Sequence, residues 1–444
     1  MPKPARPEID NFTGDATGLA IPAHPDAMRE AGADFLTRAF RAFGSLGQDN
    51  AVASIAHIEH CPGGSTGQKL FLRVAYARPD PALHSELFVK FSRDFGDDRR
   101  DAQGRFEMRS EVPFARLARG ADFPIAVPKP YFADYREACG SGLIVTERIA
   151  YGEGGIEPHR RKCFDRETMD DPLSWYRAVV TALARLAAAH KSGRLSPDID
   201  RHFPFDAATG TADPIRYDDA GLQAELESCF AFARNNPRLL PEQLRCEEFL
   251  ARMQRDSYLV KANEAALQRY LTGNPDLIAL CHWNANIDNC FFWIPEESGE
   301  AGERQCGFID WGRVGQLTFG SVLWGGLCAM HPDIWDFHLD ELLELFALVY
   351  GEHGGPRITA AALEQHLMVH MATMGVSRVL VFPEVITFRC PDIGQASGPR
   401  DPMILAIDPA RNSLQIYISF LKTWHARDFG ARVQQVLAGG GNAA

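Results

Sequence analysis

The sequence predicts an α+β protein with a small β-rich N-terminal lobe and a larger, mainly α-helical C-terminal lobe. Up to residue 148, several segments alternate apolar and polar residues, as half-buried strands do. From Leu173 onward, apolar residues recur mostly at helical spacing. A chain of 444 residues is also long for a single hydrophobic core. We therefore predict an N-terminal lobe over residues 1–148, whose first 22 residues form a loose tail, and a C-terminal lobe over residues 149–444.

Within the N-terminal lobe, helical spacing of apolar residues predicts helices over residues 26–43 and 105–120. Strands are expected on both sides of a Gly-rich turn at Gly63–Gly67, and again over residues 86–92 and 141–149. The stretch AYGEGGIEP, which follows, is expected to join the two lobes because it is rich in glycine.

In the C-terminal lobe, one long amphipathic helix is predicted over residues 173–195, and helical patterns continue to Ala265. The segments LIALCHWNANIDNCFFWI and ERQCGFIDWGRVG predict strand, loop, strand, turn and strand. Helical spacing then returns over residues 333–351, 361–382 and 413–438.

Charge and composition exclude some classes of partner. The net charge of −12 argues against a nucleic acid or an anionic membrane surface, because both require basic patches. The N-terminal residues lack the apolar core of a secretory signal, and no window approaches the roughly 20 apolar residues of a membrane span. We therefore expect a cytoplasmic protein with no membrane partner. Nothing in the sequence indicates the oligomeric state.

The glycine-rich turn PGGSTG is a candidate phosphate-binding loop, formed by Gly63, Gly64, Ser65, Thr66 and Gly67. Glycines at a strand-to-strand turn let backbone N–H groups approach phosphate oxygens closely. A plain hairpin turn is equally compatible with the pattern. The letters GGSTG also match the nucleophile elbow of α/β-hydrolases, with Ser65 as the nucleophile. That elbow requires a helix directly after the serine, and the sequence here predicts a strand.

Lys90 lies within the apolar strand ELFVKFS, where an unpaired ammonium group would be costly to bury. A lysine at this point could bind phosphate if a carboxylate held it in place. Glu111, on the following helix, is the candidate carboxylate, and Glu107 lies one helical turn earlier on the same face. The alternative is an edge-strand lysine that points into water.

The segment CHWNANIDNCFFW contains a second group of candidate residues, of which His282 is the first. Asn289 precedes one strand, and Asp310 ends the next apolar strand, just before Trp311. An amide and a carboxylate at such positions suit a hard cation that bridges phosphate oxygens. Read alone, each would be an ordinary turn residue.

Taken together, these residues resemble the aminoglycoside-phosphotransferase and choline-kinase-like group, including the ecdysteroid-kinase-like enzymes, which share the protein-kinase fold. The resemblance spans roughly residues 50–350 and is most specific in the loop from His282 to Asn289 and in Ile309–Trp311. It implies a protein-kinase-like two-lobe fold that binds ATP and Mg²⁺ and phosphorylates a small molecule.

The same resemblance assigns a role to each candidate. It implies that Lys90 binds the α- and β-phosphates and that Glu111 orients it. Asn289 and Asp310 would hold Mg²⁺. Backbone groups near Glu147 to Ile149 would hold the adenine at a hinge.

The sequence departs from the family pattern where the catalytic aspartate is expected. Asn284 stands there, and Trp283 replaces the usual glycine. An amide does not accept a proton at neutral pH, so a general base is missing. Asp288 is the nearest spare carboxylate. The prediction is an ATP-dependent phosphotransferase acting on a hydroxyl group. The alternatives are an impaired pseudo-phosphotransferase that binds nucleotide or ligand and, more remotely, a serine hydrolase at Ser65.

Overall fold

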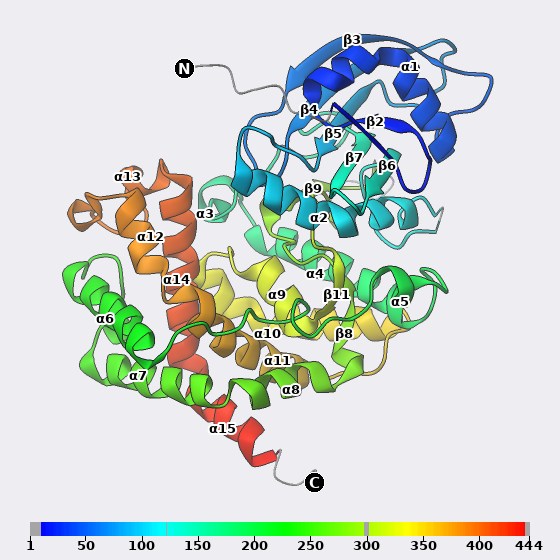
Figure 1. Ribbon diagram of the computed structural model, residues 1–444. Helices are drawn as coiled ribbons and strands as arrows, with labels where there is room; N and C mark the ends of the chain where they lie inside the picture. Colours follow the sequence, from blue (N-terminus) through cyan, green and yellow to red (C-terminus); the bar gives the residue numbers. More distant parts are fainter. Residues whose placement is uncertain (1–9, 121, 297–301, 440–444) are drawn as a thin grey trace. The chain divides into compact units, whose positions relative to one another are not determined.

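The computed structural model describes residues 10–120, 122–296 and 302–439. Its contacts divide the chain into two compact units. The first comprises Met1–Ile156 with Phe308–Val314, and the second comprises Glu157–Gly307 with Gly315–Ala444. The predicted α+β class is confirmed, with a smaller β-rich unit and a larger, mainly helical one (Figure 1). The division differs from the predicted boundary after residue 148 in two ways: the first unit extends to Ile156, and it also includes the short segment that contains Asp310.

The first unit is built on an antiparallel five-stranded sheet in the order β3-β4-β5-β7-β6. Strand β5 is therefore the central strand, with β4 on one side and β7 on the other. The sequence analysis did not identify β6, which starts at a proline and does not alternate. The strands are β3 Val52–His60, β4 Lys69–Tyr76, β5 Glu86–Phe91, β6 Pro130–Arg136 and β7 Ser141–Glu147.

Two helices, α1 Pro25–Phe43 and α2 Asp98–Leu117, pack on this sheet and form its hydrophobic core. Helix α2 begins seven residues earlier than the prediction at residue 105. Asp97 caps it, since its carboxylate accepts the backbone N–H groups of Arg99 and Arg100 at 3.0 Å. Helix α1 ends at Gly44, whose positive φ of 78° provides a left-handed cap.

Residues 10–22 are ordered, so the prediction of a loose tail is wrong for this part of the chain; residues 1–9 lie outside the described ranges. Strands β1 Asn11–Thr13 and β2 Ala20–Pro22 pair antiparallel, and Phe12 and Ile21 are buried in the core. The buried Asp134 on β6 accepts hydrogen bonds from the backbone of Ala16 and Thr17. The prediction failed because the anchoring carboxylate is distant in sequence.

Helices form most of the second unit. They are α3 Asp165–Thr168, α4 Pro172–Lys191, α5 Ile199–His202, α6 Asp219–Asn235, α7 Glu247–Ala262, α8 Glu264–Gly273, α9 Phe319–Leu327, α10 Pro332–Glu352, α11 Ala360–Met374, α12 Phe382–Arg389, α13 Pro402–Leu405, α14 Asp408–Arg427 and α15 Phe429–Gly439. The predicted helix over 413–438 is interrupted because Asp428 takes a left-handed conformation, with φ of 48°. The predicted helix over 361–382 changes to a π-helical segment at Gly375–Val379.

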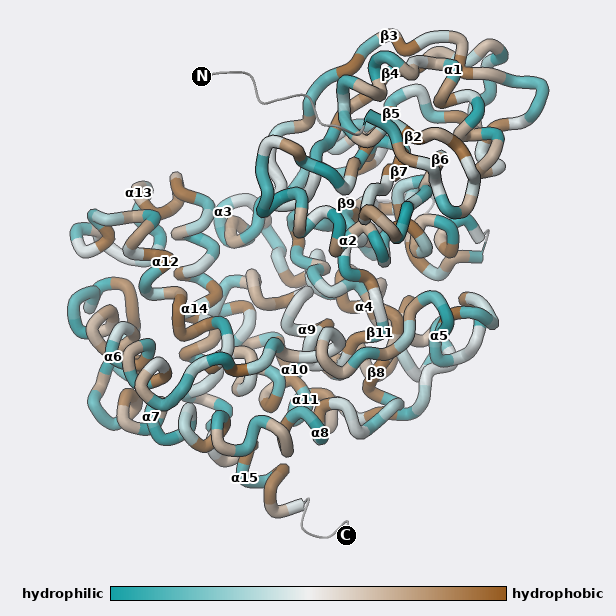
Figure 2. The backbone as a smooth tube through the Cα atoms, viewed as in Figure 1, coloured by the Kyte–Doolittle hydropathy of each residue, from teal (hydrophilic) through white to brown (hydrophobic). Residues whose placement is uncertain are grey.

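The strands of the second unit form two short ladders between the helices. Strand β8 (Ile278–Cys281) pairs antiparallel with β11 (Gly315–Thr318), and β9 (Cys290–Trp293) pairs with β10 (Gln305–Phe308). Every residue of β8 is buried, and this strand is brown, and so hydrophobic, in Figure 2.

No single helix in the described ranges is long and apolar enough to cross a membrane, whereas a bent pair over residues 360–379 and 382–389 satisfies length and composition.

His366 on α11 is buried within the second unit and connects three helices. Its Nδ1 accepts the backbone N–H of Gly320 on α9, and its Nε2 donates to the carbonyl oxygen of Leu271 on α8, both at 3.0 Å. This arrangement requires the neutral imidazole. Burial lowers the pKa of His366 from its usual 6.5 to about 4.

Acidification should therefore destabilise the protein in a window set by His366. Between pH 6.5 and 4 the unfolded chain binds a proton at this residue and the folded chain does not. The free energy of unfolding should therefore decrease as the pH is lowered from 6.5 to 4, and His366 should contribute about 3 kcal/mol to this decrease. We expect His366→Gln to show a correspondingly smaller fall in urea unfolding, although it is less stable at pH 7. The exposed His202→Gln is the control, and an unchanged pH dependence in His366→Gln would contradict the assignment.

Candidate functional site

Lys90 lies on the central strand of the first unit, where its side chain is 3% exposed. Its Nζ is 2.7 Å from Oε2 of Glu111 on α2 and 2.7 Å from Oδ1 of Asp310. The alternative of an edge-strand lysine pointing into water is therefore wrong. A buried ammonium group is tolerated here because two carboxylates compensate it.

The electrostatics of this cluster keep Lys90 charged. Burial by itself would lower the pKa of Lys90, but the carboxylates of Asp310 and Glu111 outweigh burial and raise it. With one ammonium group and two carboxylates, the cluster carries more negative than positive charge.

Asp310 is fixed by the turn that follows it. Its φ of 57° is in the left-handed region, which aspartate tolerates better than most residues. Trp311 stacks on Phe114 of α2 with ring centroids 3.8 Å apart. Gly312 sits against the side chain of Glu107, which leaves no room for a Cβ. Glu107 therefore supports this turn, and Glu111, rather than Glu107, pairs with Lys90.

The glycine-rich loop connects β3 to β4 as predicted, and Gly63, Gly64 and Gly67 all have positive φ. A Cβ at Gly67 would collide with the carbonyl oxygen of Phe91, so the end of the loop tolerates only glycine. Ser65 is exposed, whereas Thr66 is 2% exposed. Strand β4 starts at Lys69, so no helix follows Ser65 to form a nucleophile elbow.

Backbone contacts fasten this loop to the first turns of α2. The Gly67 N–H donates to the carbonyl oxygen of Arg100 at 3.1 Å, and the Arg100 guanidinium donates back to the Gly67 carbonyl at 2.6 Å. Gly104, one turn further along α2, faces the carbonyl of Ser92 and the N–H of Gly67 with no space for a side chain. The loop and α2 therefore meet through their backbones.

The predicted hinge begins where β7 ends. The N–H of Glu147 donates to the carbonyl oxygen of Lys129 at 2.9 Å, and its carboxylate pairs with His84 at 2.8 Å. Ile149 follows and is half-buried. Since the N–H of Glu147 is already bonded within the first unit, adenine recognition through this N–H would require that bond to open. The hinge assignment remains a prediction.

In the second unit, the loop after β8 is held largely by its own polar groups. His282 is fully buried, and its Nδ1 accepts the backbone N–H of Asn284 at 3.0 Å. Nδ2 of Asn286 donates to Oδ1 of Asn284 at 2.5 Å, and Nδ2 of Asn289 donates to the Asn284 carbonyl at 2.9 Å. His282 thus positions the loop. The nitrogen of the Asn289 amide is bonded inside the loop, which leaves its Oδ1 as the atom suited to a cation.

Asp288 belongs to the same loop but has a different environment. Nε2 of His159 donates to its backbone carbonyl at 2.9 Å, and its Oδ1 is buried with no hydrogen-bond partner among the described residues. Burial would lower the pKa of Lys162, but the neighbouring Asp288 carboxylate raises it. Asp288 therefore acts as a counter-charge to Lys162. Neither His159 nor Lys162 was identified from the sequence, because their spacing from the loop carries no recognisable motif.

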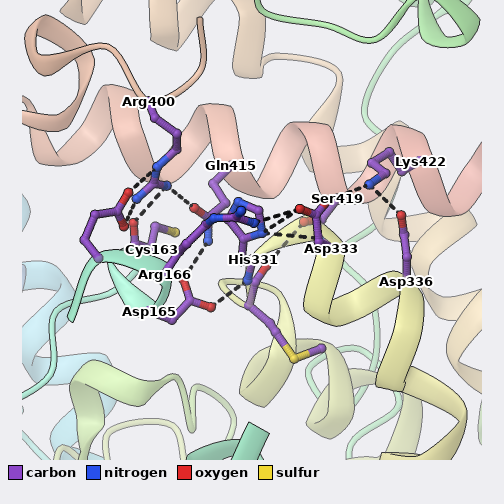
Figure 3. A network of polar contacts seen from close by, with 12 residues as sticks. Cys163, Asp165, Arg166, His331, Asp333, Asp336, Arg400, Gln415, Ser419 and Lys422 are labelled. Carbon is purple, nitrogen blue, oxygen red and sulfur yellow. Dashed lines mark hydrogen bonds and ion pairs between the residues drawn. The ribbon is translucent and has the colours of Figure 1, made fainter. Parts of the chain in front are cut away.

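A polar network holds Cys163 and Asp165, which follow Lys162 in the chain, and Figure 3 shows Arg400, Gln415 and His331 in contact with them. Arg411 donates to the carbonyl of Lys162, and Arg400 donates to the carbonyl of Cys163 at 3.4 Å and to Gln415 at 2.7 Å. The fully buried Asp165 accepts hydrogen bonds from the Tyr176 hydroxyl and from the His331 N–H, at 2.9 and 2.7 Å. Helix α14 thus holds this segment in place.

Candidate metal ligands occur in both units. Among the described residues, no group of three or more His, Cys, Asp or Glu side chains could hold a metal ion. A magnesium ion that is bound with a nucleotide needs only one or two protein oxygens, because phosphates and water supply the rest. Asp310 in the first unit and Asn289 in the second each carry such an oxygen, so each residue by itself has the chemistry of a Mg²⁺ ligand.

The loop leaves no space between its backbone and helix α9. A Cβ at Gly325 would collide with the carbonyl oxygen of Trp283, directly before Asn284. Gly325→Ala should therefore destabilise the protein by about 1–3 kcal/mol in urea unfolding, through overpacking. Gly351→Ala on α10 is the control: its Cβ would meet nothing within 4 Å, and alanine should stabilise the helix by up to about 1 kcal/mol. Equal effects of the two substitutions would contradict this packing.

A scan against protein-family models and a search of curated proteins both find no match. Solved structures similar to this chain include choline kinase from Cryptosporidium parvum Iowa II, with 12% identity and a TM-score of 0.38 over 86% of this chain and 90% of that one. Spectinomycin phosphotransferase, solved with ADP and spectinomycin, has 11% identity and a TM-score of 0.38 over 86% and 94%. The GDP complex of an aminoglycoside 2′-phosphotransferase-IIIa mutant has 12% identity and a TM-score of 0.37 over 86% and 95%. At these levels of similarity, the function has to be argued from the residues of this chain.

Proposed function

We propose that the protein is an ATP-dependent phosphotransferase with a protein-kinase-like fold that phosphorylates a hydroxyl group of a small molecule and uses Mg²⁺. The observation that carries this proposal is the buried Lys90, which lies 2.7 Å from both Glu111 and Asp310. A buried lysine oriented by one carboxylate and next to a second is what binding of a metal-bound polyphosphate requires. The glycine-rich loop before β4 adds backbone N–H groups that suit phosphate oxygens.

Phosphoryl transfer depends mainly on positioning and on electrostatic stabilisation, and Mg²⁺–ATP would supply the reactive phosphoryl group and most of the charge neutralisation. The residues of this chain have the remaining tasks. Lys90 would bind phosphate oxygens, and Glu111 would keep Lys90 in position. Asp310 and Asn289 would each offer an oxygen to the metal ion.

Asn284 determines how fast such a protein could work. Its Oδ1 already accepts a hydrogen bond from Asn286, so the group that it offers to an acceptor is chiefly its Nδ2, a donor. A donor can orient the oxygen of an acceptor hydroxyl but cannot remove its proton. We therefore expect a slow enzyme, with a rate about 10²- to 10⁴-fold below that of the same site with a base.

The second candidate function is a catalytically impaired protein that binds nucleotide or ligand without useful turnover. The observation that favours it is again Asn284, together with the buried Oδ1 of Asp288, which an acceptor hydroxyl could not reach in this arrangement. A serine hydrolase at Ser65 has less support, since a strand follows this exposed serine.

Nucleotide binding is the first test. ATP or GTP with Mg²⁺ should raise the thermal midpoint of unfolding by mass action. At a nucleotide concentration of 100 times Kd, the free energy of unfolding should increase by about 2.7 kcal/mol. In Asp310→Asn the additional stabilisation that Mg²⁺ gives with ATP should be smaller than in the wild type, because a neutral amide oxygen replaces the metal-binding carboxylate. Asp34→Asn on the exposed face of α1 is the matched control and should behave as the wild type. No shift with either nucleotide would contradict the ATP-dependent phosphotransferase and, of the second candidate, its nucleotide-binding form.

Asn284→Asp distinguishes the enzyme from the binder. With ATP, Mg²⁺ and a panel of hydroxyl-bearing metabolites, the wild type should transfer phosphate slowly, and Asn284→Asp should be about 10²- to 10⁴-fold faster. Asn284→Ala should be slower than the wild type if the amide orients the acceptor. Turnover that occurs only in Asn284→Asp would show that the natural protein is a binder.

A further inference from the structure

Lys69 is a second lysine beside the cluster around Lys90, and the sequence analysis did not identify it. It is the first residue of β4, two positions after Gly67, and it is the register partner of Lys90 on β5. Cross-strand partners project from the same face of a sheet. The two ammonium groups therefore lie on one face of the first unit.

The charges around these two lysines are distributed unequally. Lys90 has both carboxylates of the cluster within 2.7 Å. Lys69 is half-buried, and no carboxylate of the described residues forms an ion pair with it, within the 4.0 Å that defines one. Burial and, next, the charge of Lys90 lower the pKa of Lys69, and Asp310 and Glu111 only partly offset them. A half-buried cation without a partner is costly unless an anion binds there.

The glycine-rich loop shows where this anion would lie. A Cβ at Gly64 would collide with Nζ of Lys69, so the ammonium group rests directly on the backbone of the loop. Gly63, Gly64 and Gly67 all have positive φ. Successive backbone N–H groups in such turns can form concave sites for anions. Lys69 adds a full positive charge to that loop.

We propose that Lys69 is a second phosphate-binding residue, which contacts the polyphosphate of the nucleotide from β4 while Lys90 contacts it from β5. The inference rests on the proposed function, because it names a further residue of the same phosphate site. It also states the class of ligand: a polyphosphate, with more than one phosphate group to occupy two cations on neighbouring strands.

Inorganic tripolyphosphate and ATP are the probes, and calorimetric titration gives their Kd values. We expect Lys69→Met to weaken both by about 10-fold or more, because a charge-assisted hydrogen bond is lost. Lys69→Arg keeps the charge and should stay within about 3-fold of the wild type. Arg73→Met is the matched control: it removes a cation from the same face of β4, but one already paired with Glu86, and should change neither Kd.

Stability separates a binding role from a structural one. Because Lys69 repels Lys90 and forms no ion pair with a carboxylate of the described residues, Lys69→Met should have the same or a higher thermal midpoint than the wild type. A residue that only supports the fold would lower it. Binding that is equal in Lys69→Met and the wild type would overturn the inference.

The probes also separate this inference from the proposed function. If the wild type binds tripolyphosphate through Lys69 but binds neither ATP nor GTP, the polyphosphate-binding role of Lys69 stands, its ligand is not a nucleotide, and the proposed nucleotide-dependent function fails. If the wild type binds ATP and Lys69→Met binds it equally well, the proposed function stands and the inference fails. If the wild type binds neither probe, both are wrong.

Discussion

The pairing of one buried ammonium group with two carboxylates determines how the first unit is built. An unpaired Lys90 in the central strand would cost several kcal/mol, so Glu111 and Asp310 have to reach it. Helix α2, which packs against β6 and β7, must therefore bring Glu111 within reach of β5. The segment Phe308–Val314 must also return to this unit after more than 150 residues that belong to the other. The stacking of Trp311 on Phe114 holds that returning segment.

The second unit presents its polar loop by a different physical means. Its side-chain amides form hydrogen bonds with one another and with the backbone. The buried His282 accepts the backbone N–H of Asn284. These hydrogen bonds fix the backbone of the loop around Asn284. In this loop Asn284 contributes a fixed amide rather than a titratable carboxylate. Such a loop is better suited to positioning a bound group than to accepting a proton from it.

The sequence was informative where a residue stands out against its surroundings. Lys90 is a charged residue within an apolar strand, and Asp310 ends another apolar strand, so both could be identified as candidates. The sequence also placed the carboxylate that pairs with Lys90 on one face of a helix, at Glu111 or Glu107. Lys69 could not be identified as a candidate from the sequence, because a lysine at the start of a strand is common. Its position opposite Lys90 follows only from the strand register in the structure. The anchoring of residues 10–22 by Asp134 likewise depends on proximity in space.

The close approach of Gly67 and Gly104 has a consequence for regulation. Where two backbones touch without side chains between them, there is no soft layer that can repack, so the start of α2 cannot slide or roll over the loop by degrees. Moving α2 away would break the hydrogen bonds between Gly67 and Arg100. It would also separate Glu111 from Lys90 and so break their ion pair. If the protein has the proposed phosphotransferase activity, displacing this helix is therefore an unfavourable way to switch it off, and control would act more readily on the glycine-rich loop or on the supply of ligand.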